Sequence, residues 1–123
     1  MLCALESMSA RSLLTQTPPH AVEASLERLG RDLRVARLRR NLTMAQVAER
    51  IGAGVRAVAD AEKGKATTSV AVYLALLWAY GLLGDVALLA APERDAEGEA
   101  LAALRAPRRA TSTTSGGILD DDF

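Results

Sequence analysis

Apolar residues recur along this chain at the three- and four-residue intervals of an α-helix, in runs that end at polar residues, Gly or Pro. The first run follows Pro19, where we expect one long helix with a single buried stripe. The stripe consists of Val22, Leu26, Leu29, Leu33 and Ala36. Arg28, Arg31 and Arg34 lie away from it, which favours a solvated helix face over a phosphate-binding surface.

A second, shorter helix is predicted to begin at Thr43. Thr43 and Gln46 stand three residues apart, the spacing of a capping box, in which each side chain accepts a hydrogen bond from the other residue's backbone N–H. Three apolar residues then share one helix face: Val47, Ala48 and Ile51. Gly52 follows, and glycine is the residue that most readily ends a helix in the left-handed conformation.

A third helix is predicted directly after this glycine. Its apolar residues are Val55, Val58 and Ala61, and Gly64 ends the run. Because helices of under about ten residues are unstable alone, these two must pack across each other, and the small side chain of Ala48 allows a close approach. Two short helices joined by a tight turn predict a helix-turn-helix, whose second helix projects outward and fits the major groove of DNA.

Residues 69–83 form the most apolar segment, for which we predict a helix capped by Ser69 and ended by Gly81. The uncharged run 70–84 is shorter than the roughly 20 residues that span a bilayer, which favours a core helix over a membrane span. Because the segment is apolar all round, more than one face must be covered, and we predict a homodimer. The expected dimer or partner contacts are Tyr73, Trp78, Tyr80 and Leu82.

The remaining segments are predicted to be peripheral. Asp85 can cap a short helix through Ala91, and residues 97–105 form another. The expected domains are a flexible leader (1–19), a helix-turn-helix DNA-binding domain (20–91), a short C-terminal helix with a basic end (92–109) and a flexible acidic tail (110–123). In the tail, Leu119 and Phe123 flank three aspartates. This terminal segment is either a solubilising acidic end or a short motif whose Leu119 and Phe123 contact a partner.

The charge is unevenly placed along the chain. Its 123 residues have a formal net charge of zero and are enough for one domain with tails. Residues 21–65, however, carry ten Lys or Arg against six Asp or Glu, whereas residues 66–123 carry four against eight. The positive half coincides with the predicted DNA reader, and the negative half is expected to face a basic partner surface.

Candidate catalytic or metal-binding chemistry is sparse. Cys3 is the single cysteine and His20 the single histidine, and neither belongs to a disulfide or zinc pattern. The sequence has no nucleophile–base constellation and no phosphate-binding glycine loop. We therefore predict no enzyme activity, no metal and no cofactor. The leader lacks the pattern of a signal peptide, which favours a cytoplasmic protein.

Residues Leu42–Lys65 resemble, in register and without gaps, the helix-turn-helix of the Xre/Cro, lambda-repressor-like family. Around them, Leu29–Arg40, Tyr73–Leu83 and Pro92–Asp95 are similar to HipB-type antitoxins. The resemblance implies an all-α, compact five-helix lambda-repressor-like domain that binds a palindromic operator in double-stranded DNA as a homodimer. It also implies an antitoxin that represses its own operon and holds a HipA-like serine/threonine kinase toxin inactive.

The resemblance places the start of the first motif helix and the exposed face of the second against DNA. The residues implied at this interface are Thr43, Met44, Gly54, Val55, Arg56, Ala57, Asp60, Lys63 and Lys65. Arg56 is the strong candidate base reader, because arginine can bind guanine bidentately, and Asp60 is expected to accept from cytosine or to orient Arg56. Lys63 and Lys65 are expected to contact backbone phosphates.

The sequence departs from the family at two of these positions. Met44 and Gly54 stand where relatives usually have Gln and Ser, so we expect weak intrinsic affinity, compensated by dimerisation or by the reading of DNA shape. By the same resemblance, Arg37 and Glu62 form a partly buried ion pair that fixes the angle between their helices. Two alternatives remain open: a protein-interaction module whose helix-turn-helix no longer binds DNA, and a stand-alone phage-type regulator.

Overall fold

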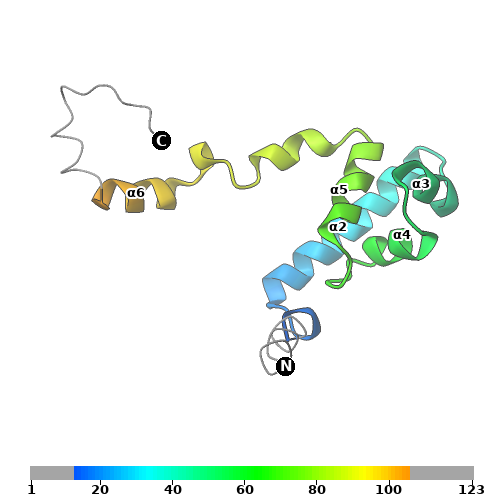
Figure 1. The fold of residues 1–123 in the computed structure, drawn as a ribbon, viewed down its shortest axis with the longest axis horizontal. Coiled ribbons are helices and arrows are strands. Elements are labelled where there is room, and N and C mark those ends of the chain that lie inside the picture. The colour runs from blue at the N-terminus through cyan, green and yellow to red at the C-terminus, as the bar shows by residue number, and fades with distance from the viewer. Residues whose placement is uncertain (1–12, 106–123) are drawn as a thin grey trace, which may run out of the picture. The chain divides into compact units, whose positions relative to one another are not determined.

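The computed structural model describes residues 13–105, and these fold into helices without any strand. After a short helical turn at 13–16, the elements are α2 (His20–Arg39), α3 (Met44–Ile51), α4 (Val55–Glu62), α5 (Val70–Ala79), the 3-10 helices η1 (Leu83–Leu88) and η2 (Pro92–Arg94), and α6 (Ala96–Arg105) (Figure 1). The predicted all-α class is confirmed. The predictions for 1–12 and 106–123, including those for Leu119 and Phe123, lie outside the described residues.

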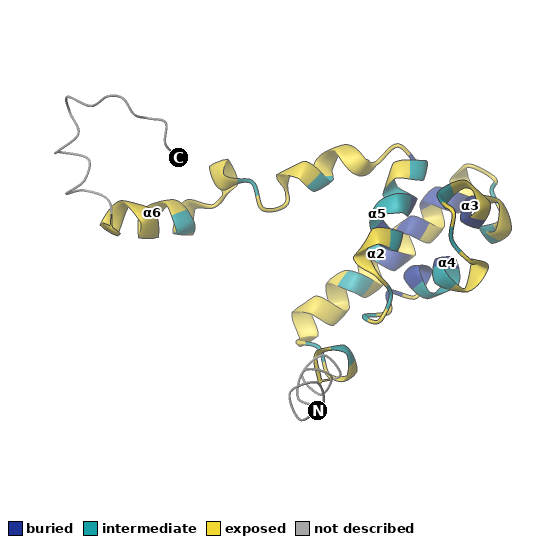
Figure 2. Ribbon diagram, viewed as in Figure 1, coloured by how far each residue is buried: buried dark blue, intermediate teal, exposed yellow. Residues whose placement is uncertain are grey.

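The chain divides into two compact units between Leu83 and Gly84. The first unit holds α2 to α5, and its core lies where these four helices meet (Figure 2). The buried apolar residues of this core are Leu33, Ala36, Val47, Ala48, Val58, Ala61, Tyr73, Leu76 and Tyr80. The core therefore draws on all four helices, with the two predicted motif helices at its centre.

Helix α2 is as long as its apolar stripe predicts, but only part of the stripe is covered. Leu33 and Ala36 are buried, and Leu26 and Leu29 pack partly against the core. Val22, the first member of the predicted stripe, is instead 44% exposed, because the N-terminal turns of α2 contribute nothing to the core (Figure 2). The periodicity gave the correct face of the helix and overestimated how far that face is covered.

Helices α3 and α4 begin and end where the sequence predicts. Gln46 N–H donates to Thr43 Oγ1 (3.1 Å), and Thr43 N–H donates to Gln46 Oε1 (2.8 Å), which completes the capping box. Gly52 ends α3 in the left-handed conformation with φ of 74°. Ala48, the small residue expected where the two helices cross, is buried in the core.

Two glycines bring the backbones of α2 and of the turn after α4 into direct contact. A Cβ at Gly30 would lie 2.6 Å from the carbonyl oxygens of Ala61 and Glu62, closer than any Cβ can stand. Gly64 has φ of 72°, and a Cβ there would meet the backbone of Leu26 at 2.5 Å. The sequence pattern indicates Gly64 only as a helix terminator and indicates no role for Gly30, whereas both are required for this approach.

Helix α5 begins at the predicted cap, where Ser69 Oγ accepts from the N–H of Ala71 (3.0 Å), and the chain leaves it through Gly81 at φ of 76°. Its tyrosines correct one prediction. Tyr73 and Tyr80, expected at a dimer or partner contact, are buried within the unit's own core. The pattern could not show this, because a helix that is apolar on every side does not reveal which face packs inward. Trp78 and Leu82 do remain exposed.

The second unit differs from the expected pair of short helices. The predicted helix at 85–91 is a 3-10 helix that begins two residues earlier, at Leu83, so Asp85 lies inside its first turn and does not cap it. Helix α6 begins at Ala96, and Asp95 precedes it, with Oδ1 accepting from the N–H of Gly98 (2.9 Å). None of residues 84–105 is buried. The described residues of this unit therefore form no buried core.

Candidate nucleic-acid interface

The turn between α3 and α4 consists of Gly52, Ala53 and Gly54. Ala53 N–H donates to the carbonyl of Ala48 (2.9 Å), which satisfies the end of α3, while Gly54 adopts an extended conformation at the N-cap of α4. No atom lies within 4 Å of a Cβ placed at either glycine, so this turn faces open space. The N-terminus of α4 has no side-chain cap, which leaves its first backbone N–H groups available to a phosphate.

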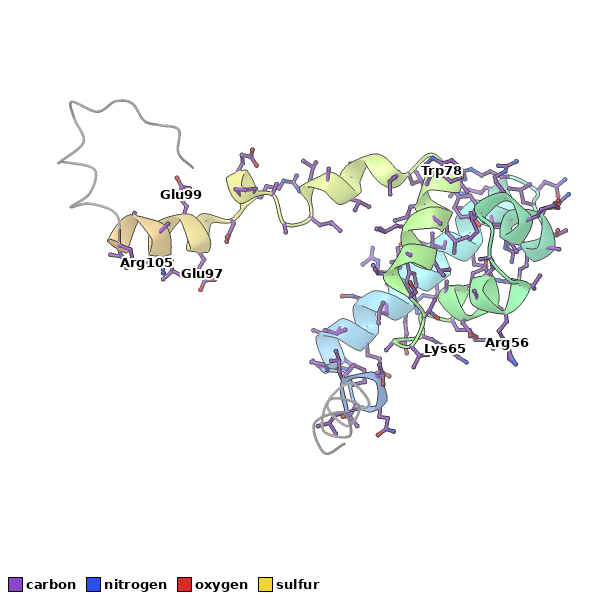
Figure 3. All side chains as sticks on the ribbon, in the orientation of Figure 1. Arg56, Lys65, Trp78, Glu97, Glu99 and Arg105 are labelled. Carbon is purple, nitrogen blue, oxygen red and sulfur yellow. The ribbon has the colours of Figure 1, made fainter. Side chains whose placement is uncertain are left out.

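The outward face of α4 carries the basic residues that the sequence predicts at DNA. Val58, Ala61 and Glu62 are buried, whereas Arg56 is exposed on the opposite side of the helix (Figure 3). Lys63, the C-cap residue of α4, is exposed as well. Neither side chain forms an ion pair within the part of the chain that the structure describes. Val55 is exposed beside Arg56, and Ala57 is half-buried. The exposed arginine is therefore free to reach a base edge.

Asp60 pairs with Lys65 and not with Arg56 among the described residues, so one of its two expected roles, orienting Arg56, is not seen. Its Oδ1 lies 3.3 Å from Lys65 Nζ, and the N–H of Lys65 donates to the Asp60 carbonyl (3.2 Å). The carboxylate thus fixes the loop that leaves α4, and it does not orient Arg56. Because Lys65 is half-exposed in this pair, its ammonium still faces solvent, with part of its charge already compensated.

The start of α3 has fewer groups available to contact DNA than the sequence suggested. Thr43 is exposed, but its hydroxyl oxygen already accepts the capping hydrogen bond, so only its O–H proton is left to donate to a phosphate. Met44 packs partly against the core. We therefore see α4 and the loop after it as the principal part of this surface.

A family model described as a helix-turn-helix domain matches residues 28–90, about half of the chain. The chain belongs to the helix-turn-helix domain family. No curated protein and no solved structure matches it. The match begins within α2 and ends just after η1, so it covers both motif helices and the core that supports them. None of the described helices is long and apolar enough to cross a membrane.

A buried ion pair sets the position of the second motif helix of this helix-turn-helix domain. Arg37 Nε donates to Glu62 Oε2 at 2.6 Å, and Nη2 donates to Oε1 at 3.0 Å, with both side chains over nine-tenths buried. The hydrogen bond to Glu62 raises the pKa of Arg37 further above its usual value. The expected contact is therefore present, and its two parallel hydrogen bonds fix direction as well as distance.

Arg37 also reaches a third element that the sequence did not indicate. Its Nη1 donates to the carbonyl of Leu42 (2.9 Å), in the loop that leads into α3. One guanidinium thus ties the end of α2 to the start of α3 and to the end of α4. The two motif helices are held in one geometry by a residue that does not itself face the outward surface.

Two further contacts, which no sequence pattern indicated, attach α5 to the motif. Tyr73 Oη donates to the carbonyl of Lys65 (2.8 Å), in the loop that carries the candidate phosphate contact. Arg40 donates from Nη2 to the carbonyl of Tyr80 (2.8 Å), and its guanidinium lies 5.5 Å from the centre of the Tyr80 ring. Helix α5 therefore supports the loop after α4 at one end and the end of α2 at the other.

Proposed function

We propose that this protein is a sequence-specific DNA-binding transcriptional repressor that binds a palindromic operator as a homodimer. The observation that supports this most is the outward face of α4 and its C-cap, where Arg56 and Lys63 are exposed and form no ion pair with any other described residue, on a helix whose position is fixed by the Arg37–Glu62 pair. A rigid helix presenting unpaired basic side chains is the arrangement by which helix-turn-helix domains enter the major groove.

The contacts divide into one that reads sequence and several that position the helix. Arg56 has the geometry to bind O6 and N7 of a guanine, and the methyl groups of Val55 and Ala57 suit a thymine methyl. Lys63 and Lys65 suit backbone phosphates. With a single strong base reader, this surface depends on two copies at adjacent half-sites and on the deformability of the DNA between them. In such a dimer two α4 helices lie about 34 Å apart.

The exposed apolar side chains of α5 and of the segment after it are suited to form the dimer contact. Trp78 is 58% exposed near the C-terminal end of α5 (Figure 3), and Leu82 follows one turn later. Large aromatic side chains that remain in solvent in the monomer are typical anchors of protein interfaces. We propose Trp78 and Leu82 as the dimer contact, in place of Tyr73 and Tyr80, which are buried in the core.

The deciding experiment is a fluorescence anisotropy titration of the full chain against the DNA upstream of its own gene, with a shuffled duplex of equal composition as competitor. We expect preferential binding to the upstream fragment and an affinity that falls steeply with salt. Arg56→Ala should reduce the preference, whereas Arg28→Ala, an exposed arginine on α2, should leave it unchanged. Binding that is indifferent both to sequence and to salt would contradict the proposal.

We further propose, from the similarity of the flanking segments to HipB-type antitoxins, that the repressor controls its own operon and inhibits a HipA-like serine/threonine kinase. The acidic character of the C-terminal half is compatible with a basic partner surface. A kinase of this type encoded beside the gene, and inhibited in a phosphorylation assay by the purified protein, would support this role. If the neighbouring genes encode no such kinase, the protein is a stand-alone regulator.

A further inference from the structure

We propose that α6 of one copy docks, in parallel orientation, on the outward face of α2 of a second copy. The inference rests on the homodimer of the proposed function and adds to it a second contact, made twice by symmetry. It starts from two amphipathic surfaces, each of which is left exposed by the described residues of its own unit. One lies on the side of α2 that faces away from the core, and the other lies on α6.

The surface on α2 consists of Arg31, Val35 and Leu38, spaced by four and then three residues. At 100° per residue these three share one face, which is turned away from the buried Leu33 and Arg37. Val35 and Leu38 are large apolar residues left about half exposed on a helix that carries five arginines against three acids. In this stripe the basic residue, Arg31, precedes the two apolar residues, Val35 and Leu38.

The surface on α6 repeats this spacing with the opposite charge. Glu97, Leu101 and Leu104 are also separated by four and then three residues, and the two leucines are 53% and 78% exposed. Figure 3 shows Glu97 on the opposite side of α6 from Glu99, so Glu99 does not belong to this stripe. Residues 84–105 carry five acids against two arginines. The acidic end of the stripe is again the N-terminal end.

Parallel docking brings the two stripes into register. Glu97 then lies opposite Arg31, Leu101 opposite Val35, and Leu104 opposite Leu38. The antiparallel arrangement would press the Glu97 carboxylate against Leu38 and Arg31 against Leu104, which removes solvent from charges without pairing them. The order of charge and apolar residues along both helices therefore selects one orientation.

The apolar side of α6 needs a partner surface that covers it. None of residues 84–105 is buried, and a ten-residue helix is marginal in water when nothing covers its apolar side. One helix of this length, about 15 Å long, covers less than a specific interface requires. Two reciprocal contacts in a symmetric dimer double that area and add to the Trp78 contact. These considerations favour a second copy as the partner of α6.

The test is sedimentation equilibrium of the full chain without DNA, so that its outcome is independent of operator binding. Arg31→Glu and Glu97→Arg place like charges at both copies of the contact, and each should weaken self-association about fivefold. In an equimolar mixture of the two variants, a mixed dimer restores opposite charges at both contacts. We therefore expect the mixture to associate as tightly as the wild-type protein.

Substitution of an exposed leucine by aspartate, with one matched control, completes the experiment. Leu104→Asp should weaken self-association at least about tenfold, while Leu89→Asp, equally exposed at 77% but outside α6, should not. The proposal is overturned if both charge variants associate like the wild-type protein, or if they are weakened and mixing restores nothing, which would place α6 on its own chain. A wild-type protein that is monomeric without DNA overturns it as well, even if operator binding is then observed.

Discussion

Arg37 and Glu62 stand 25 residues apart in the chain and meet side by side in the interior of the helix-turn-helix domain, joined by two hydrogen bonds of 2.6 and 3.0 Å. The pair connects the long first helix to the last turn of the candidate reading helix. Because the remaining guanidinium nitrogen donates to the carbonyl of Leu42, the arginine has a partner on each side. The orientation of α4 towards DNA therefore depends on two charges that face away from it.

Loss of either charge should destabilise the domain strongly. Arg37→Ala leaves the Glu62 carboxylate buried without a partner, and Glu62→Ala leaves the guanidinium in the same state. We expect each to lower the free energy of unfolding by about 3–5 kcal/mol, measured by urea denaturation followed by circular dichroism. Arg34→Ala, an exposed arginine on the same helix, should change it by less than about 0.5 kcal/mol. Equal effects of Arg37→Ala and Arg34→Ala would show that the pair contributes little to stability.

Gly30 should tolerate no side chain. A methyl group there would overlap the carbonyl oxygens of Ala61 and Glu62, so α2 and α4 would have to separate. Gly30→Ala should therefore cost about 3 kcal/mol or more in urea denaturation, the upper end of overpacking effects, although alanine favours helix formation. Gly54→Ser is the control, because a Cβ at Gly54 meets no atom and serine is a good N-cap, so this variant should be neutral or slightly stabilising. A neutral Gly30→Ala would refute the close backbone contact.

The sequence predicted well those features that depend on neighbouring residues. The capping box of Thr43 and Gln46 and the left-handed Gly52 are local, and both appear as expected. Asp95 is a further local signal: it precedes α6, and its carboxylate accepts a hydrogen bond from the N–H of the third residue of the helix, so the helix begins one residue before the predicted start at 97. Such features are predictable because their energetics lie within a few residues of chain.

Features that depend on contacts with distant segments could not be predicted from the hydrophobic pattern of the sequence. Nothing about Gly30 in the sequence shows that a second backbone lies against it, and nothing about α5 shows that Tyr73 and Tyr80 point inward while Trp78 points out. The outward face of α4 was predictable, since helical periodicity places Arg56 opposite Val58. The pairing of Asp60 with Lys65 was not, because it depends on the path of the loop after α4.

Lys63 and Arg56 should contribute to DNA binding in different ways. Lys63→Ala should weaken binding to operator and shuffled duplex alike, and it should reduce the slope of log affinity against log salt by about one. Arg56→Ala should instead reduce the preference for the operator by about 1–3 kcal/mol. Anisotropy titrations at four salt concentrations separate the two effects. If Lys63→Ala changes the preference and leaves the salt slope intact, our assignment of reading and positioning roles is reversed.

Loss of the hydroxyl should change the stability of the protein differently at the two buried tyrosines. Tyr73 Oη donates to the Lys65 carbonyl, so Tyr73→Phe should lower stability by about 1 kcal/mol. Tyr80 Oη is buried without a hydrogen-bond partner within the described residues, so Tyr80→Phe removes an unsatisfied polar atom and should be neutral or stabilising. Urea denaturation at pH 7 measures both. Destabilisation by Tyr80→Phe equal to that by Tyr73→Phe would show that the Tyr80 hydroxyl does have a partner.

The same tyrosines predict a loss of stability in alkali. Burial raises the pKa of both Tyr73 and Tyr80 above the ordinary value of 10.0, because the phenolate cannot be solvated in the core. The unfolded chain therefore releases these protons first, and stability that is complete below pH 10 should fall as the pH rises above it. Tyr80→Phe removes one of the two groups, so this variant should lose less stability between pH 9 and pH 11 than the wild-type protein. Thermal denaturation across that range measures the difference, and parallel curves for the two proteins would exclude Tyr80 as a source of the alkaline loss.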